Sequence, residues 1–311
     1  MVDVIALGTT FIDYFFNANP SLFKKLKIDA EGDYLLDELK ISKKSLFNKQ
    51  TLIAKSPGGV SLNTSAILSS LNLKSAYYGV IGDDEDGDFW TTRLKRIDKS
   101  KIIRKGESSV CACLLSNRGK QRAFISFINP YDEYVLKHPD LQFLNSAKII
   151  HLGPFSKSSP SSLTKIGKLL GKIKGPKISF TPTLLYAKHG IKKIIPILKN
   201  VDILFVNKNE LKGLTEKDQK SGSKYLLRFG PQIIVCTMGA RGALITTKNS
   251  QFTQKAQKVK HITDTTGAGD AYAAGFLYGI LKNKSLKWSA KFANKIAARS
   301  LSNFGLTWLT L

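Results

Sequence analysis

The stretch DTTGAGDAYAAGFLYGIL, residues 264–281, holds two glycines and an aspartate in one turn and then continues as an apolar helical pattern. The first amides of a helix have no partners within the helix, and the helix dipole places positive potential at that end. A glycine-rich entry to a helix therefore favours an anion. Asp270, which stands in this turn, is either a helix cap or a functional group.

Short β-branched segments alternate with helical patterns along most of the chain. The patterns predict strands and helices in turn, the strands at residues 2–8, 76–82, 147–153, 176–180, 201–207 and 232–239 and the helices at 61–72, 161–174 and 190–200. Such alternation is typical of an α/β fold with a mostly parallel central sheet and right-handed crossovers.

Two regions do not follow this alternation. Residues 14–51 are polar and aromatic, and VCACLLSNRGKQRAFISFI at 110–128 has the pattern of a β-hairpin that turns at residues 117–119. We expect them to form a small β lid, about 14–51 and 108–128, inserted in the core of a single domain that spans residues 1–311.

Composition narrows the functional classes. The 311 residues carry a formal charge of +25, but the lysines are dispersed and no basic block interleaves with aromatic residues, so we expect a solvated surface and no nucleic-acid partner. The start of the chain, MVDVIALG, is short and has no basic leader, so we expect no signal peptide, and we expect no membrane span because the apolar run after Asp270 is interrupted. The three cysteines, Cys111, Cys113 and Cys236, cannot make a disulfide framework, and the CAC spacing suits a strand better than a zinc knuckle. A cytoplasmic location is expected.

Polar residues and glycines follow several of the predicted strands, and in parallel sheets these positions meet at one edge, where ligands bind. They are Asp13, Asn207 with Glu210, Thr237 with Gly239 and Gly242, and the turn at Asp270. Each has a structural alternative: a polar loop group, a helix cap, a hairpin turn and a second cap, respectively.

Two motifs resemble those of the ribokinase-like (PfkB-type) kinases. DTTGAGDAYAAGF resembles the late signature of that family, and GGVSLNTSAILSSLN at 58–72 followed by GVIGDDEDG at 79–87 resembles the early one. NKNE at 207–210 and TMGARG at 237–242 follow in the family's order. The resemblance implies a ribokinase-like three-layer core, phosphoryl transfer from ATP to an alcohol, and a lid that closes over the substrate.

Phosphoryl transfer requires an oriented hydroxyl group, an acceptor for its proton and stabilisation of the moving phosphoryl group. Asp270 is the candidate base, and the amides of Gly267, Ala268 and Gly269 are candidates for an anion hole. Because Asp270 stands at a helix N-terminus, we expect it to stay ionised, with its basicity coming from geometry more than from a raised pKa.

The resemblance also implies an ATP side of the site. It assigns Asn207, Thr237, Gly239 and Gly242 to ATP binding, and Glu210 to Mg²⁺ through water, with a capped helix as the alternative. Asp264 is a candidate for supporting a monovalent-cation loop.

On the acceptor side, Asp13, Gly58, Gly59 and Asn63 match the residues with which the family holds a sugar ring, and carboxylate and amide groups suit a diol. Phe155, in GPFS, is either a platform for a nucleoside base or an ordinary buried phenylalanine. Arg122 either approaches the phosphates when the lid closes or is an exposed strand charge.

The segment at 19–39 is more similar to adenosine kinases than to ribokinase or fructokinase, and SFTPTLLYAKHG lacks the Asp-Pro-Asn-x-Arg run of sugar-specific members. We therefore expect a kinase that phosphorylates an adenosine-like nucleoside at its 5′-hydroxyl. The alternatives are a sugar kinase for ribose, fructose or a related sugar, and a nucleotide-binding protein without catalysis. Monomer and homodimer both remain open.

Overall fold

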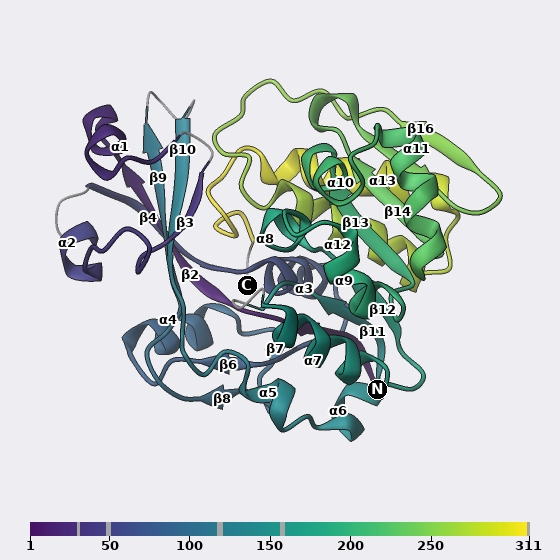
Figure 1. Ribbon diagram of the computed structural model, residues 1–311, viewed down its shortest axis with the longest axis horizontal. Helices are drawn as coiled ribbons and strands as arrows, with labels where there is room; N and C mark the ends of the chain where they lie inside the picture. The colour runs from purple at the N-terminus through teal and green to yellow at the C-terminus, as the bar shows by residue number, and fades with distance from the viewer. Residues whose placement is uncertain (30–31, 48–50, 117–120, 156–158, 310–311) are drawn as a thin grey trace.

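The computed structural model describes residues 1–29, 32–47, 51–116, 121–155 and 159–309, with Gln121 and Arg122 described by their backbone alone. Its largest element is a nine-stranded sheet (Figure 1). Across the sheet the strands follow the order β7 (Ile97–Asp98), β5 (Ser75–Tyr78), β1 (Val2–Leu7), β11 (Ala147–Leu152), β12 (Lys177–Phe180), β13 (Ile203–Asn207), β14 (Ile233–Thr237), β15 (Ala243–Thr246) and β16 (Gln251–Gln254). Neighbouring strands from β7 to β14 are parallel, whereas β15 is antiparallel to β14 and β16 to β15.

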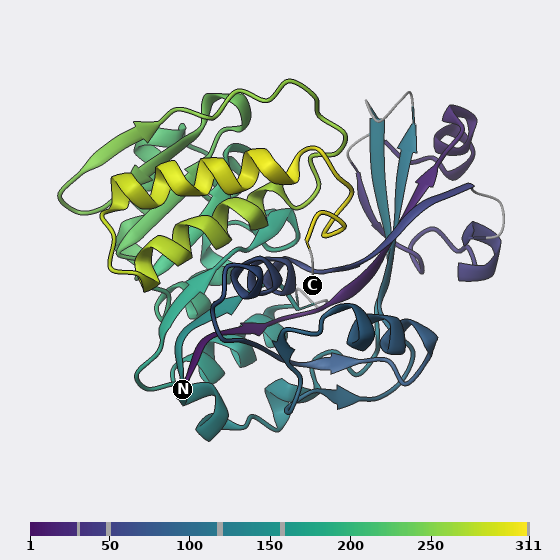
Figure 2. The ribbon, with the colours of Figure 1, turned by 180° about the vertical axis from the view of Figure 1, so that it is seen from behind.

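Helices cover both faces of this sheet, as Figures 1 and 2 show from opposite sides. Alternate side chains of β1 belong to different cores, Ile5 and Leu7 to one and Val4 and Ala6 to the other. The first core is closed by α5 (Tyr134–Lys137), α6 (Leu141–Asn145), α7 (Pro160–Leu170), α8 (Thr183–Ala187), α9 (Ile191–Leu198), α10 (Lys208–Thr215) and α11 (Gln219–Leu226). The second is closed by α3 (Val60–Ser70), α4 (Glu85–Arg93), α12 (Ala268–Leu281) and α13 (Leu286–Ser300). The predicted three-layer α/β core with a mostly parallel sheet is confirmed.

A second sheet of five strands projects to one side of the core (Figure 1). Its order is β3 (Asp33–Leu35), β10 (Gln121–Phe127), β9 (Val110–Ser116), β2 (Phe11–Asn17) and β4 (Thr51–Gly58), accompanied by α1 (Pro20–Leu26) and α2 (Lys43–Phe47). We call it the lid sheet. It contains the two regions expected to form the lid but extends to Phe11 and Gly58, so that Asp13 lies on the sheet itself. The predicted hairpin turn at 117–119 lies outside the described residues.

One predicted strand was wrong. Residues 76–82 do not form one strand, because β5 ends before Gly79 and β6 (Val80–Ile81) pairs with β8 (Ile103–Arg104) in a separate two-stranded sheet. A Cβ at Gly79 would lie 2.3 Å from the Tyr77 hydroxyl oxygen. Short apolar runs carry no signal for such a change of sheet, since both halves are buried.

Side-chain contacts join the lid sheet to the rest of the molecule on both sides. Near α4, Lys55 Nζ lies 2.7 Å from Asp86 Oδ1, which also accepts a hydrogen bond from the Tyr14 hydroxyl. On the opposite side the segment after α13 packs on the sheet, where the rings of Phe304 and Phe15 lie 5.4 Å apart and the Leu306 amide donates to Ser56 Oγ. Within the described part of the chain, no helix has the length and apolar character needed to cross a membrane.

Candidate active site

The turn before α12 is shaped by Asp264 and Gly267. Asp264 Oδ1 accepts hydrogen bonds from the Thr266 amide (2.9 Å) and hydroxyl (2.7 Å), while its other carboxylate oxygen is buried without a partner among the described residues. Gly267 precedes the helix with φ 74°, in the left-handed region that favours glycine. Asp270 then lies in the first turn of the helix.

Asp270 is held by the facing helix α3. Asn63 Nδ2 donates to Asp270 Oδ2 at 2.8 Å, and the Thr64 hydroxyl donates to the Asp270 carbonyl at 3.2 Å. Because α3 carries the early motif and α12 the late one, their packing brings both motifs to one point. Thr64 was not predicted to be a site residue, because its position next to Asn63 in the sequence does not indicate a contact with Asp270.

The pKa of Asp270 corrects an expectation. Its side chain is only 9% exposed, and burial raises its pKa to about 7. The hydrogen bond from Asn63 lowers the pKa and the charge of Glu210 raises it, both by less than burial does. The sequence argument considered the helix dipole alone, whereas desolvation of the carboxylate is the larger effect. Asp270 is therefore poised to exchange a proton near neutral pH.

Open space lies in front of this turn. A Cβ on Gly269 would meet no heavy atom within 4 Å, and one on Gly267 would approach only Asn63 (3.7 Å) and Asp270 (3.9 Å). Of the three amides expected to form the anion hole, that of Ala268 already donates a long hydrogen bond to the Thr265 carbonyl (3.3 Å). An anion at this turn would compete with that bond.

The acceptor-side residues lie where the lid sheet meets α3. Asp13 on β2 is 7% exposed, and burial, followed by the charges of Asp270 and Asp264, raises its pKa to about 7. A Cβ on Gly58 would fall 2.0 Å from Asp13 Oδ2, so only glycine leaves room for this carboxylate. Gly59 caps the N-terminus of α3 with φ 106°, and a Cβ there would lie 2.7 Å from the Thr9 carbonyl oxygen. The structure therefore brings Asp13, Asn63 and Asp270 into one buried site.

The ATP-side residues Asn207 and Glu210 form a capping box at α10. Asn207 Oδ1 accepts from the amides of Asn209 and Glu210, and Glu210 Oε2 accepts from the Asn207 amide (2.9 Å). Asn207 Nδ2 donates to Glu210 Oε1 (2.6 Å), so both carboxylate oxygens are engaged. Burial raises the pKa of Glu210 to about 7. The structure thus has the capped helix that the sequence left as the alternative to a metal-associated pair.

The glycines of TMGARG differ in what surrounds them. Gly239 has φ 60°, and a Cβ there would meet nothing within 4 Å. Gly242 has φ 90°, and a Cβ there would lie 2.0 Å from the Gln254 carbonyl oxygen. Both glycines lie in the turn of the β14–β15 hairpin, the structural alternative for this pair, and Gly242 is required there because its backbone passes close to β16. Thr237 is the last residue of β14.

Phe155 and Arg122 are the two remaining residues expected on the acceptor side. Phe155 is 0% exposed in the core between the sheet and α7, and its backbone is bonded to the Tyr186 hydroxyl, so its ring is not available to stack on a base. The alternative given above, an ordinary buried phenylalanine, describes this position, since the Phe155 ring packs in the first core. Arg122 lies on β10 opposite Leu115, and the contact expected of its side chain lies outside the described part of the chain.

A cavity of about 360 Å³ lies elsewhere, between residues 130–137 and 159–165, and none of the predicted site residues lines it. The candidate active site is defined by the carboxylates and glycines described above. The residues that line the cavity do not repeat that combination of groups. The structure also places two thiols beside Asp13, on β9, a neighbour that the sequence did not indicate.

Comparison with known proteins finds sequence relatives and solved structures of the same fold. An uncharacterized sugar kinase of Archaeoglobus fulgidus is 29% identical over 76% of this chain and 95% of its own length. A probable chloroplastic fructokinase-6 of Arabidopsis thaliana is 27% identical over 82% of this chain and 70% of its own. The solved adenosine kinase of Sinorhizobium meliloti has the same fold, with a TM-score of 0.84 and 20% identity over 98% of this chain and 95% of that one. The family model for pfkB family carbohydrate kinases matches residues 27–308. This chain belongs to the pfkB family of carbohydrate kinases and is an ATP-dependent phosphotransferase that acts on an alcohol group.

Proposed function

We propose that the enzyme transfers the γ-phosphoryl group of ATP to the hydroxymethyl group of a sugar ring. One observation carries the proposal: Asp270, buried and bonded to Asn63, lies in the first turn of α12 beside Asp13 of the lid sheet. The first carboxylate is suited to take a proton, and the second is suited to hold neighbouring hydroxyl groups.

In the proposed reaction Asp13 accepts hydrogen bonds from two ring hydroxyls and so orients the ring. The reacting hydroxyl faces Asp270, which takes its proton as the oxygen forms a bond to the γ-phosphorus and the bond to the ADP oxygen breaks. The phosphoryl oxygens face the first-turn amides beyond Gly267, where glycines permit close approach. Both carboxylates are buried, which raises their pKa values. A substrate bound between them would lose its contact with water.

Mg²⁺ fits the ATP side through water. Kinases of this family use ATP with Mg²⁺, which offsets phosphate charge. Glu210 is near enough for its charge to raise the pKa of Asp270, and a cation between these groups would relieve that repulsion. Because the capping box engages both Glu210 oxygens, we propose that Asn207 and Glu210 orient waters of the ion and do not bind it directly. Thr237 and Gly239 are proposed to contact the nucleotide phosphates.

A free sugar is favoured over a nucleoside as the acceptor. The nucleoside expectation rested on the segment at 19–39, on the missing Asp-Pro-Asn-x-Arg run and on Phe155 as a possible base platform, and of these the Phe155 ring is enclosed in the core. The sequence relatives are named as a sugar kinase and a fructokinase. A nucleoside remains the second candidate because the residues that would hold its ribose, Asp13 and Asn63, are the same ones.

The test is ADP formation with ATP and Mg²⁺ against ribose, fructose, other pentoses and hexoses, and adenosine, guanosine and cytidine, with Asp270→Asn as the background control. The proposal predicts that at least one free sugar has a higher kcat/KM than every nucleoside. Turnover confined to nucleosides would overturn the choice of acceptor but leave the phosphoryl-transfer mechanism. ATP use that is the same with and without every acceptor would overturn the function.

A further inference from the structure

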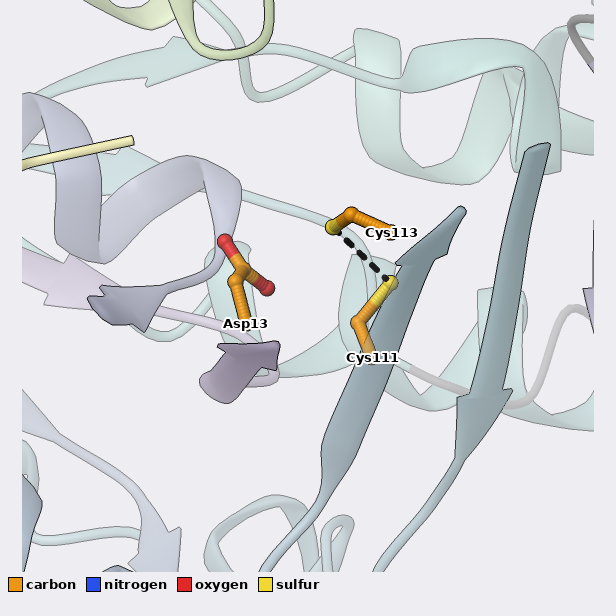
Figure 3. Close-up of side chains that lie close together, drawn as sticks. All are labelled: Asp13, Cys111 and Cys113. Atoms are coloured by element: carbon orange, nitrogen blue, oxygen red, sulfur yellow. Dashed lines mark hydrogen bonds between the residues drawn. The ribbon is translucent and has the colours of Figure 1, made fainter. Parts of the chain in front are cut away.

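Two cysteines of the lid sheet lie against Asp13. Cys111 and Cys113 are two residues apart on β9, so their side chains lie on the same face of the strand. β9 runs parallel to β2 with Cys111 directly opposite Asp13, which places the carboxylate on that face too. Figure 3 shows the carboxylate and the two sulfurs turned toward a common space. The strand predicted from the CAC spacing thus supplies two of the three ligand atoms, and β2 supplies the third.

The distances suit a single ion. The two Sγ atoms are 3.9 Å apart, and one carboxylate oxygen and both sulfurs lie within 4.8 Å of one another. Tetrahedral zinc with bonds to sulfur of about 2.3 Å sets its sulfurs about 3.8 Å apart. The pair of thiols therefore already has the spacing of two zinc ligands, and closing the carboxylate onto an ion requires a shift of about 1 Å.

The surroundings leave these groups available to a ligand. Cys111 and Cys113 are both free thiols, 8% and 1% exposed, beside Phe15 and Leu115. Within the described residues, the Asp13 carboxylate receives no hydrogen bond and forms no salt bridge, and the residue is only 7% exposed. A buried carboxylate without a donor is costly unless a ligand completes it.

We propose that Asp13, Cys111 and Cys113 form a binding site for a thiophilic divalent cation, Zn²⁺, and that the bound ion excludes the acceptor. Three protein ligands of the types Asp and Cys leave a fourth position of the tetrahedron for water. Binding converts both thiols to thiolates and releases two protons to solvent, and a third is released from every molecule in which the Asp13 carboxyl is protonated beforehand. The divalent cation and its three anionic ligands, two thiolates and the Asp13 carboxylate, carry one net negative charge. No oxidation state changes, so the step needs no oxidant or reductant. The competition with the acceptor rests on the proposed function, since both use Asp13, whereas the ion site itself does not.

Direct binding is measured on the whole chain, without nucleotide and with a thiol-free reductant. Cd²⁺ is the probe because sulfur-to-cadmium charge transfer absorbs in the ultraviolet, and Zn²⁺ is then added to displace it. We expect one ion per chain, a charge-transfer band, and loss of both in Cys111→Ala/Cys113→Ala. Cys236→Ala is the matched control, because Cys236 is also buried but lies on β14 of the central sheet.

An unchanged band in the double cysteine variant, or a band that is lost in Cys236→Ala, would overturn the ion site. Should the double variant fail to fold, the single variants Cys111→Ala and Cys113→Ala decide, since each removes one thiolate and is expected to weaken binding at least tenfold. Asp13→Asn is expected to retain the band with lower affinity.

Competition is measured as inhibition at fixed free Zn²⁺ with increasing acceptor. We expect inhibition that the acceptor relieves in the wild type, and a double cysteine variant that is active and resistant. Inhibition that is indifferent to the acceptor, or equal in the double variant, would overturn the exclusion of the acceptor. A preparation with no kinase activity that still shows the charge-transfer band would refute the proposed function and uphold the ion site, so the two failures are distinguishable.

Discussion

The two halves of the active site contain the same group in different settings. At the start of α12, Asp270 has a donor in Asn63 and a helix N-terminus behind it. On the lid sheet, Asp13 has no donor among the described residues and faces two thiols. Burial raises the pKa of both to about 7, so burial alone does not distinguish them. The difference is that Asp270 is already positioned by protein, whereas Asp13 is left to be satisfied by a ligand.

If Asp270 is the base, its loss produces the largest effect. Asp270→Asn keeps the shape and the contact with Asn63 but cannot take a proton, so we expect kcat to fall by about 10²–10⁴. The measurement is steady-state turnover with saturating acceptor and MgATP, alongside thermal unfolding and ATP binding, which are expected to change little.

Asp202→Asn is the control, because Asp202 Oδ2 accepts a hydrogen bond from the Ile178 amide at the opposite end of the central sheet. Its turnover is expected to match the wild type. Near-normal turnover of Asp270→Asn, with chemistry limiting the rate, would show that another group takes the proton.

Loss of Asp13 is expected to act on the acceptor. Asp13→Ala removes charge-assisted hydrogen bonds worth about 1.5–3 kcal/mol, which corresponds to a loss of about 10–100-fold in kcat/KM for the acceptor. The KM for ATP is expected to stay within about twofold, because Asp13 lies on the lid sheet. If Asp13→Ala weakened ATP to the same extent as the acceptor, the assignment of Asp13 to the acceptor side would be wrong.

A smaller change tests why Gly58 is glycine. In Gly58→Ala the new methyl would fall 2.0 Å from Asp13 Oδ2, and the carboxylate has to move. Overpacking of this kind costs about 1–3 kcal/mol. We expect a higher KM for the acceptor and a lower Tm.

Gly171→Ala is the comparison variant for Gly58→Ala, since its methyl would make ordinary contacts at 3.5 Å and beyond. It is expected to leave the KM and the Tm unchanged. Equal behaviour of the two variants would remove the steric argument for Gly58.

The smallest expected effect is a shift in pH dependence. Asn63→Ala removes the donor that lowers the pKa of Asp270, so the ionised base forms only at higher pH. The acidic limb of the kcat profile is expected to move to higher pH, with the loss of turnover smaller above the limb than below it. A shift to lower pH would contradict the role of Asn63.

Much of the core was predictable because parallel strands are continuous apolar runs and their connecting helices are periodic. The predicted strands at 147–153 and 201–207 correspond to β11 and β13, and the predicted helix at 61–72 to α3. The change of sheet at Gly79 was not predictable, since it depends on where β8 pairs.

The site was less predictable than the fold. Motif positions indicated Asp270 and Asn63, but which side chain turns inward is a property of packing, so the sequence left Phe155 open between a base platform and a buried core residue. The raised pKa of Asp270 depends on its burial by the facing helix, which sequence cannot supply. Cys111 and Asp13 are neighbours only through the register of β9 on β2, two strands 98 residues apart at that pair.

The central claim is that two buried carboxylates, Asp270 of α12 and Asp13 of the lid sheet, must both be ionised for phosphoryl transfer. The direct measurement is log(kcat/KM) for the acceptor against pH, at saturating MgATP, in the wild type and in Asp13→Asn. Because each raised pKa lies at about 7, each ionised fraction falls about tenfold per pH unit below it. The account predicts a limiting slope of about 2 in the wild type and about 1 in Asp13→Asn. A wild-type profile that is flat below pH 7, or a slope that Asp13→Asn leaves unchanged, would contradict it.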